Sequence, residues 1–549
     1  MLHPSDPRLD EILDQLGPLF QENRLEEAEA LCLEAIGILE NLTQAHPDDH
    51  GLRSLLASMH YNRGNACSST RRLDEAEAEF RTALAIQEQL VREDPANAEY
   101  RNHQARSHFN LGNVYLDGDR WTEAEPNFLL AQALWIELAE ADPSNAEYHH
   151  EIARSCFNLA YIRSVPGRED EAIASYRQAQ TTWRDLIEVQ GEQIQWVYDL
   201  ARAHFNLGAL YQKLDRLREA EGEWLQAAPL FDNLARAHPD AGAFVRDAIQ
   251  AQDRLIDLFR EQRRVEPFLR LLDESARMRE ETARARGDLP GLLHAMTMTF
   301  IDAATWLADQ VQRPAEAEAT YRRAIDYARR LAGHQASPET LQLLAAVLFD
   351  HGSLCRMTDC LDAAEESLRR AADIWERLHA SLPHLPQHAS WLAGAHNNLG
   401  ILYANTGRPD RAETAYHRAL GIREGRARAA PKDLDNLLYL AGTCCNLGNL
   451  AVDRGEPAIA LEWFDRSIGM LKEVLKGRPD DATARQFLDN ARDGRARAEA
   501  MPPSPGLPIA GSATVLARPP GPPPVLVGSP DQHGGTCPGL DDYRAGRYR

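Results

Sequence analysis

The sequence predicts an all-α protein whose helices stack into an α-solenoid of about ten repeats. Two observations predict this class: a marker residue returns at a fixed interval, and each interval holds two stretches of helical periodicity. The marker is an Asn that recurs every 48 residues, at Asn62, Asn110, Asn158 and Asn206 and again at Asn398 and Asn446. An interval kept from residue 62 to residue 446 indicates duplication of one structural unit, and units of this size stack into solenoids.

Small and large residues keep the same interval. A small residue follows two positions after the marker, at Gly64, Gly112, Ala160, Gly208, Gly352, Gly400 and Gly448. A larger side chain comes sixteen positions after each small residue, at Phe80, Phe128, Tyr176, Trp224, Leu368, Tyr416 and Phe464. Small residues let two helix backbones approach closely, and large ones fill the space beside them. We therefore expect Gly112 and Gly208 to lie where the two helices of a repeat come closest.

Each interval predicts two helices joined by a tight turn. Apolar residues recur at helical spacing between Tyr100 and Tyr115, and again between Trp121 and Leu138. The segment Asp-Gly-Asp-Arg between these stretches is typical of a turn. A single hairpin of this kind cannot bury both of its apolar faces, so neighbouring hairpins must stack.

Three segments of the chain resemble a known repeat family. "FNLGNVYLDGDRWTEAEPNFLLAQAL", "FNLGALYQKLDRLREAEGEWLQAA" and "NNLGILYANTGRPDRAETAYHRAL" are similar to tetratricopeptide repeats, which set Leu-Gly and then Tyr on a first helix and Ala, an aromatic residue and Ala on a second. The resemblance covers about residues 8–499 and implies a right-handed α-solenoid. The interval of 48 residues exceeds the usual length of about 34. An added heptad in each helix explains the excess, because it turns the packing face by only about 20°. Long arrays such as the kinesin-light-chain-like repeats, and arrays in bacterial signalling proteins, are similar in kind.

The chain divides into three predicted regions. We expect the repeat array over residues 1–480, with a divergent repeat at about 241–287, then a C-terminal capping helix over 481–499. Residues 500–549 are rich in Pro and Gly and are expected to form a disordered tail. The divergent repeat reflects either drift of one copy or a bend or partner-specific patch. Tyr321 lies one position late, which indicates a one-residue insertion in the following repeat.

Composition narrows the class of function. A net charge of −23 argues against a general nucleic-acid binder, which normally carries a basic stripe. No stretch approaches the length of about 20 apolar residues that a membrane span needs. The first residues lack the pattern of an export signal, so we expect a cytoplasmic protein. Four cysteines that fall on core positions are expected to be small buried hydrophobes: Cys32, Cys67, Cys156 and Cys355.

Catalytic and metal-binding motifs are not found in the sequence. It contains no P-loop, GxSxG, HExxH or kinase catalytic loop, so we expect no enzyme and no cofactor. Four histidines share one repeat position, His60, His108, His204 and His396. Phe300 and Leu348 occupy that position elsewhere, which indicates packing. No carboxylate or Cys accompanies these histidines at ligand spacing, so we expect no metal site.

The resemblance places the candidate binding residues on the first helix of each repeat. In tetratricopeptide repeats that helix lines the concave groove, and the marker residue points into it. The candidates are Asn62, Asn110, Asn158, Asn206, Asn398 and Asn446, with Arg106, Arg154 and Arg202 one helical turn before three of them. Asn pairs with backbone amides, and Arg pairs with carboxylates. We therefore expect a protein or an extended peptide as ligand, with an acidic side chain or a C-terminal carboxylate.

Four alternatives remain open at this stage. Duplication copies residues whether or not they act, so recurrence of the Asn need not mean binding. The Asn side chains could instead satisfy polar groups between adjacent helices. The array could be a regulatory sensor that binds a peptide or small ligand and controls an associated kinase or transcription regulator. An enzyme of unseen type is the last alternative.

Overall fold

The computed structural model describes residues 6–502, and every regular element in that range is an α-helix. The tail predicted over residues 500–549 lies outside the described residues from 503 onward. The chain separates into two compact units, residues 1–278 and 279–549, whose division falls inside one helix. The first unit holds α1 (Pro7–Gln21), α2 (Leu25–Ala45), α3 (His50–Ser69), α4 (Leu73–Glu93), α5 (Ala98–Asp117), α6 (Trp121–Ala141), α7 (Ala146–Arg163), α8 (Glu169–Gln190), α9 (Ile194–Lys213), α10 (Leu217–Ala237) and α11 (Gly242–Glu261). Next come α12 (Val265–Arg286), across the division, and α13 (Leu289–Asp309), α14 (Pro314–His334), α15 (Pro338–Met357), α16 (Leu361–Ser381), α17 (Pro386–Asn405), α18 (Pro409–Ala429), α19 (Leu434–Asp453), α20 (Pro457–Gly477) and α21 (Ala482–Glu499).

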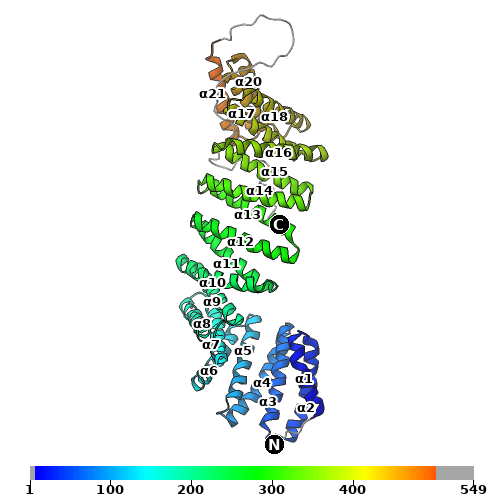
Figure 1. Ribbon diagram of the computed structural model, residues 1–549, viewed down its shortest axis with the longest axis vertical. Helices are drawn as coiled ribbons and strands as arrows, with labels where there is room; N and C mark the ends of the chain where they lie inside the picture. Colours follow the sequence, from blue (N-terminus) through cyan, green and yellow to red (C-terminus); the bar gives the residue numbers. More distant parts are fainter. Residues whose placement is uncertain (1–5, 503–549) are drawn as a thin grey trace. The chain divides into compact units, whose positions relative to one another are not determined.

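Successive helices form hairpins, which confirms the predicted α-solenoid architecture (Figure 1). Odd-numbered helices from α1 to α19 are called first helices below, and even-numbered ones second helices. Within the first unit, second helices begin at Leu25, Leu73, Trp121, Glu169 and Leu217, each 48 residues after the last. Helix α14 begins at Pro314, which is 49 residues after Val265 and agrees with the one-residue insertion.

The turns inside the hairpins are tight because of their backbone conformation. The side chain of Asn97 caps α5 by accepting hydrogen bonds from the N–H groups of Glu99 and Tyr100. At the other end, Asp119 adopts a left-handed φ of 57° between α5 and α6, and Asp215 does the same between α9 and α10. Asp tolerates this conformation better than most residues, so three residues suffice to reverse the chain.

The hairpins close on contacts between a Gly and a large ring. A Cβ placed on Gly112 would lie 2.9 Å from Cε1 of Phe128, and one on Gly208 would lie 2.5 Å from Nε1 of Trp224. Phe128 and Trp224 are fully buried, and the Trp224 indole N–H donates to the carbonyl of Phe205 at 3.1 Å. The prediction that these glycines lie at the closest approach of two helices is therefore confirmed.

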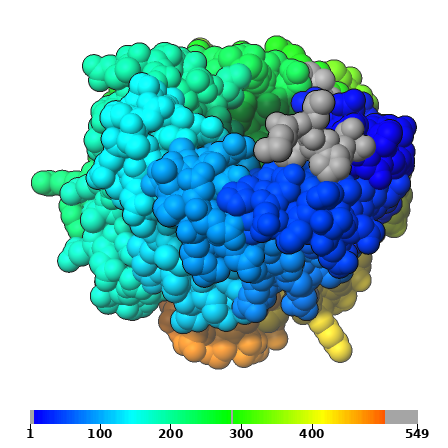
Figure 2. Space-filling model, turned by 90° about the horizontal axis from the view of Figure 1, so that it is seen from below, coloured from blue at the N-terminus to red at the C-terminus, as the bar shows by residue number. Residues whose placement is uncertain are grey.

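Hairpins also pack on one another within each unit. The second helix of one repeat packs against the first helix of the next, as α4 does against α5 and α16 against α17. In the space-filling view the side chains of successive helices of the first unit, from blue to cyan, are closely packed (Figure 2). The four core cysteines named above are buried as expected. No helix among residues 6–502 has the length and apolar character that crossing a membrane requires.

The ends of the array and its divergent segment are helical too. Helix α21 lies against α19 and α20, where Phe487 and Leu488 join the apolar core around Phe464. The divergent segment at 241–287 contains α11 and α12, and the division between Met278 and Arg279 falls within it. The sequence did not predict that division.

We predict that a branched side chain at the hairpin contact destabilises the protein. Gly112→Val and Gly208→Val should each lower the free energy of unfolding by about 1–3 kcal/mol, because the buried rings cannot move aside. Gly222→Val on α10 is the matched control, since a Cβ there meets nothing within 4 Å. Urea or thermal unfolding followed by circular dichroism measures the difference. Equal stability of all three variants would contradict the contact.

Candidate functional site

Most of the predicted binding residues lie on consecutive first helices of the first unit, and Asn398 and Asn446 lie on α17 and α19 of the second. Arg106 and Asn110 are one turn apart on α5, Arg154 occupies the corresponding place on α7, and Arg202 occupies it on α9. These first helices also contact one another across the repeats: α3 contacts α5, and α7 contacts α9. The fold therefore places first helices of neighbouring repeats in contact with one another.

The marker Asn side chains join the first helices of neighbouring repeats. The amide nitrogen of Asn110 donates to the Tyr61 hydroxyl at 2.9 Å and to Oδ1 of Asn65 at 2.8 Å, both on α3. Asn158 donates in the same way to Oδ1 of Asn113 on α5 at 3.1 Å. Each Asn therefore satisfies a polar group on the preceding first helix, which is one of the alternatives that the sequence left open.

The same link recurs in the second unit. Asn398 donates to Oγ of Ser353 at 3.1 Å, and Asn446 donates to Oδ1 of Asn397 at 3.1 Å. These two Asn side chains are buried, whereas those of the first unit, Asn62, Asn110, Asn158 and Asn206, are half-buried. A ligand reaches half-buried amides more readily, so the first unit is the better candidate for recognition.

The three Arg side chains are held at the surface by aromatic rings and carboxylates. The guanidinium of Arg154 lies over the ring of Phe109 at 4.5 Å, and that of Arg202 lies over Phe157 at 4.9 Å. Arg106 forms an ion pair with Glu147. About two fifths of each Arg side chain is exposed, 38%, 39% and 45% in chain order. Stacking fixes the orientation of a guanidinium while its N–H edge still meets water.

Two carboxylates that the sequence analysis did not predict accompany these arginines, the half-buried Glu151 and the buried Asp199. Glu151 accepts hydrogen bonds from Arg154 at 3.0 Å, and Asp199 accepts one from Gln195 at 2.9 Å. Burial raises the pKa of both acids. The signal that identifies them is again the interval, because residues 151 and 199 are 48 positions apart. The surface thus offers acceptors as well as donors.

The histidine series has internal partners. Nδ1 of His60 lies 2.7 Å from Glu79, that of His108 lies 3.0 Å from Asn127, and that of His204 lies 2.6 Å from Glu223. Each contact joins the first and second helices of one repeat. The histidines therefore act in packing each hairpin.

Family models match two parts of the chain. One tetratricopeptide-repeat model matches residues 392–425 and 440–482, and a second matches residues 57–90. The matched segments fall on helical hairpins of the kind described above. The chain is a tetratricopeptide-repeat protein.

Solved structures show only a distant likeness to this tetratricopeptide-repeat protein. Apo RapI is 14% identical over 59% of this chain and 99% of its own, with a TM-score of 0.35. The apo quorum sensor NprR from B. thuringiensis is 14% identical over 68% and 89%, with a TM-score of 0.35. The nuclear import adaptor Nro1 of S. pombe is 11% identical over 54% and 99%, with a TM-score of 0.33. Such values do not establish a shared function. No curated protein matches the chain.

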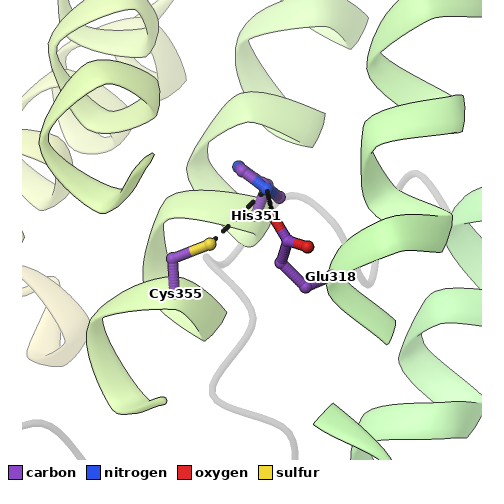
Figure 3. A group of neighbouring side chains, drawn as sticks. All are labelled: Glu318, His351 and Cys355. Carbon is purple, nitrogen blue, oxygen red and sulfur yellow. Dashed lines mark hydrogen bonds and ion pairs between the residues drawn. The ribbon is translucent and has the colours of Figure 1, made fainter. Parts of the chain in front are cut away.

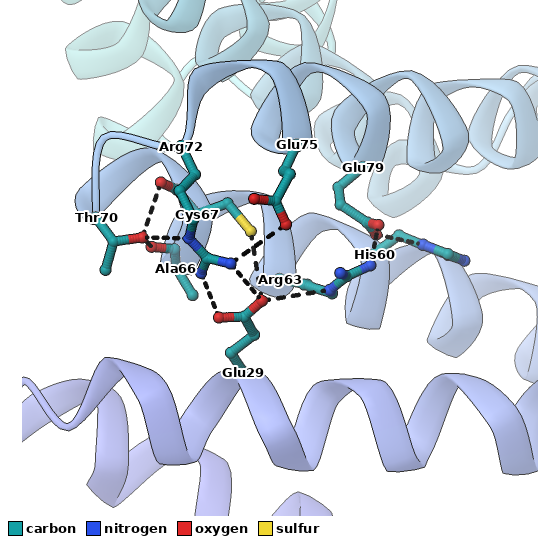
Figure 4. A network of polar contacts seen from close by, with 9 residues as sticks. All are labelled: Glu29, His60, Arg63, Ala66, Cys67, Thr70, Arg72, Glu75 and Glu79. Carbon is teal, nitrogen blue, oxygen red and sulfur yellow. Dashed lines mark hydrogen bonds and ion pairs between the residues drawn. The ribbon is translucent and has the colours of Figure 1, made fainter.

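A second polar contact joins neighbouring tetratricopeptide repeats, and we call it the Glu clamp. The Glu at the fifth position of a second helix pairs with the Arg that precedes the next second helix. The pairs are Glu29–Arg72, Glu77–Arg120, Glu125–Arg168, Glu221–Arg264 and Glu365–Arg408. Figure 4 shows the first of them, where Arg72 and Arg63 both approach Glu29.

At the Glu125 clamp, two arginines favour the ionised carboxylate. In the clamp of α6, the two terminal nitrogens of the Arg168 guanidinium each lie 2.7 Å from an oxygen of Glu125, and Nε of Arg163 lies at 2.8 Å. These arginines lower the pKa of Glu125 from 4.5 to about 2. Since the folded state favours the carboxylate, the clamp contributes its full stability above pH 4.5 and loses it as the pH falls toward 2.

We predict that Glu125→Gln lowers the free energy of unfolding at pH 7 by about 1.5–3 kcal/mol, because two arginines lose a charged acceptor. The difference between wild type and variant should narrow as the pH falls below 4.5, where the wild-type carboxylate begins to take up protons on unfolding. Thermal unfolding at a series of pH values measures it. Glu140→Gln, an exposed change on the same helix, is the control. A difference that stays constant down to pH 3 would contradict the clamp.

Proposed function

We propose that this repeat array is a non-catalytic protein-interaction scaffold that binds an extended peptide along α5, α7 and α9. The observation that carries the proposal is the set of half-exposed guanidinium groups of Arg106, Arg154 and Arg202, which occupy one repeat position on three neighbouring first helices. A row of oriented donors at a regular interval matches a ligand whose own groups repeat along an extended chain.

The contacts between first helices support an inner binding surface. First helices contact each other in pairs such as α3–α5 and α7–α9, whereas contact between successive second helices is weaker. Helices that lie closer together are on the inside of a curve. This difference supports the proposal that the surface carrying the arginines is the inner one of the first unit, the kind of surface that solenoid proteins use for binding.

Ligand chemistry follows from the groups on this surface. The exposed N–H edges of the arginines favour an acidic side chain or a C-terminal carboxylate, and each charge-assisted contact contributes about 1.5–3 kcal/mol. Asn110 and Asn158 use their amide nitrogens for the neighbouring helix, so their carbonyl oxygens are the groups proposed to accept from peptide N–H donors. The buried Asn398 and Asn446 are assigned to packing alone.

Two effects oppose the binding of an acidic ligand. The chain has a net charge of −23, although salt screens distant charges beyond about 8 Å. Arg106 and Arg154 already pair with Glu147 and Glu151. Exchange of one carboxylate partner for another costs little where the pair is half-exposed, because such pairs are worth about 0–1 kcal/mol.

A regulatory role, in which the bound peptide controls an associated kinase or transcription regulator, would use the same surface. The identity of the partner that co-purifies with the chain decides between a scaffold and a regulatory subunit.

We predict that the triple change Arg106→Ala, Arg154→Ala, Arg202→Ala weakens peptide binding at least tenfold, which corresponds to about 1.4 kcal/mol. The probe is a peptide selected on the full chain from a library with free C-termini, and calorimetry measures its affinity. The melting temperature of the triple variant should differ little from that of the wild-type protein, since the arginines are exposed.

The matched control is Arg92→Ala, Arg184→Ala, Arg236→Ala, which removes the same charge from exposed positions on second helices. Equal affinity in the two triple variants would place recognition elsewhere on the array. A large loss of stability without ligand would make the first-helix arginines structural.

A further inference from the structure

One Glu clamp of the second unit is built from different residues. Glu318 occupies the clamp position on α14, but Cys360 stands where the next repeat of other clamps has an Arg. His351 replaces the Leu that precedes Gly in four other repeats, and Cys355 occupies a place that is Tyr in three of them. Three departures, His351, Cys355 and Cys360, therefore occur around a Glu whose usual clamp arginine is missing, and each introduces a side chain that can bind metals.

The donor atoms of Glu318, His351 and Cys355 converge between α14 and α15 (Figure 3). Nε2 of His351 lies 3.3 Å from Oε1 of Glu318 and 3.4 Å from Sγ of Cys355. His351 and Cys355 are one helical turn apart on α15 and are buried, and Glu318 is 14% exposed. All three donor atoms lie within 4.8 Å of one another.

These separations match the edges of a tetrahedral zinc site. Zinc bonds of about 2.0–2.1 Å to nitrogen, about 2.0–2.2 Å to oxygen and about 2.3 Å to sulfur give tetrahedron edges near 3.3 Å from nitrogen to oxygen and near 3.6 Å from nitrogen to sulfur. The observed distances are 3.3 and 3.4 Å. One imidazole, one thiolate and one carboxylate also form a donor set that suits Zn²⁺ better than the oxygen-preferring Mg²⁺ or Ca²⁺.

The surroundings orient the imidazole. Nδ1 of His351 lies 2.8 Å from Oγ of Ser367 on α16. With the proton on Nδ1 donated to this hydroxyl, the lone pair of Nε2 points toward Glu318 and Cys355. Metal-binding histidines are usually held in this way by a second hydrogen bond.

Two groups compete with a metal at this site. Arg322, one turn along α14, contacts Oε1 of Glu318 at 2.7 Å, but its side chain is 66% exposed and such a pair is weak. The Cys355 thiol must lose its proton, since a metal-bound thiol is a thiolate. Burial raises the pKa of that thiol, so metal binding releases one proton to solvent.

We propose that Glu318, His351 and Cys355 bind one Zn²⁺ ion, with a water molecule in the fourth position. The ion supplies the positive charge that an arginine supplies at the other clamps, and it ties α14 to α15 across the repeat boundary. This site is independent of the peptide-binding surface, and it revises the expectation from sequence that the chain holds no metal.

The N-terminal clamp provides a matched comparison within the chain. Cys67 occupies the repeat position of Cys355, and its Sγ lies 3.8 Å from Oε1 of Glu29. In the N-terminal clamp, however, Arg63 occupies the repeat position of His351, and Arg72 occupies that of Cys360 (Figure 4). Two guanidinium groups already balance the charge of Glu29, so we expect no metal ion at this clamp.

The test is metal titration of the full chain after removal of metal with a chelator. Zinc binding is measured by calorimetry, and Co²⁺ serves as a spectroscopic probe because a thiolate ligand gives a charge-transfer band. We expect one tight equivalent, a thiolate-to-cobalt band and a rise in melting temperature with added zinc. His351→Leu and Cys355→Ser should each weaken zinc binding by roughly 100-fold or more, since even outer-shell partners of a metal are worth about 10–100-fold.

Controls separate loss of the site from loss of the fold. His351→Leu restores the residue found at this position in other repeats, so its circular dichroism should match wild type. If Cys355→Ser is misfolded, Glu318→Gln at the exposed edge of the site replaces it and should weaken binding similarly. Cys67→Ser should bind zinc as wild type does. Undiminished binding in His351→Leu, or no tight equivalent in wild type, would overturn the proposal.

Discussion

Six hairpins of the described chain depend on the contact between a large buried side chain of the second helix and a first-helix glycine that has no room for a Cβ. Phe128 against Gly112 and Trp224 against Gly208 set the distance between the two helices. Interiors pack densely, so this distance cannot drift. With the hairpin fixed, the direction of each first helix is fixed too, and so is the surface on which its polar residues lie.

Polar contacts between hairpins build on that geometry in two layers. The Asn links join first helices, as Asn158 does to Asn113. The Glu clamps join five of the second helices to the turn inside the next hairpin, as Glu125 does to Arg168. Both layers use groups that are partly or fully buried, where hydrogen bonds are stronger than on an open surface. The proposed zinc site is a third kind of contact between neighbouring repeats, in which a metal ion takes the place of the arginine.

The surface proposed for recognition serves stability and binding together. Arg154 rests on Phe109 of the preceding repeat and pairs with Glu151 of its own helix, yet much of its guanidinium meets solvent. A group held in this way loses little conformational freedom when it binds a ligand. The same contacts explain why recurrence alone could not separate a binding role from a packing role, because one side chain has partners of both kinds.

The sequence by itself determined the hairpin, its interval and the glycine contacts, because each depends on residues at most a few tens of positions apart that repeat along the chain. Phe128, Gly112 and the turn at Asp119 were predicted on that basis and confirmed. Only the tertiary structure decided the partners of the Asn amides, since Asn110 reaches Asn65 in the preceding repeat. It also brought Glu318, at a regular clamp position, to His351 and Cys355, two departures from the repeat pattern on the next helix. Sequence motifs identify metal ligands that are closely spaced in one segment. These donor atoms come from two helices and meet only because the helices pack side by side.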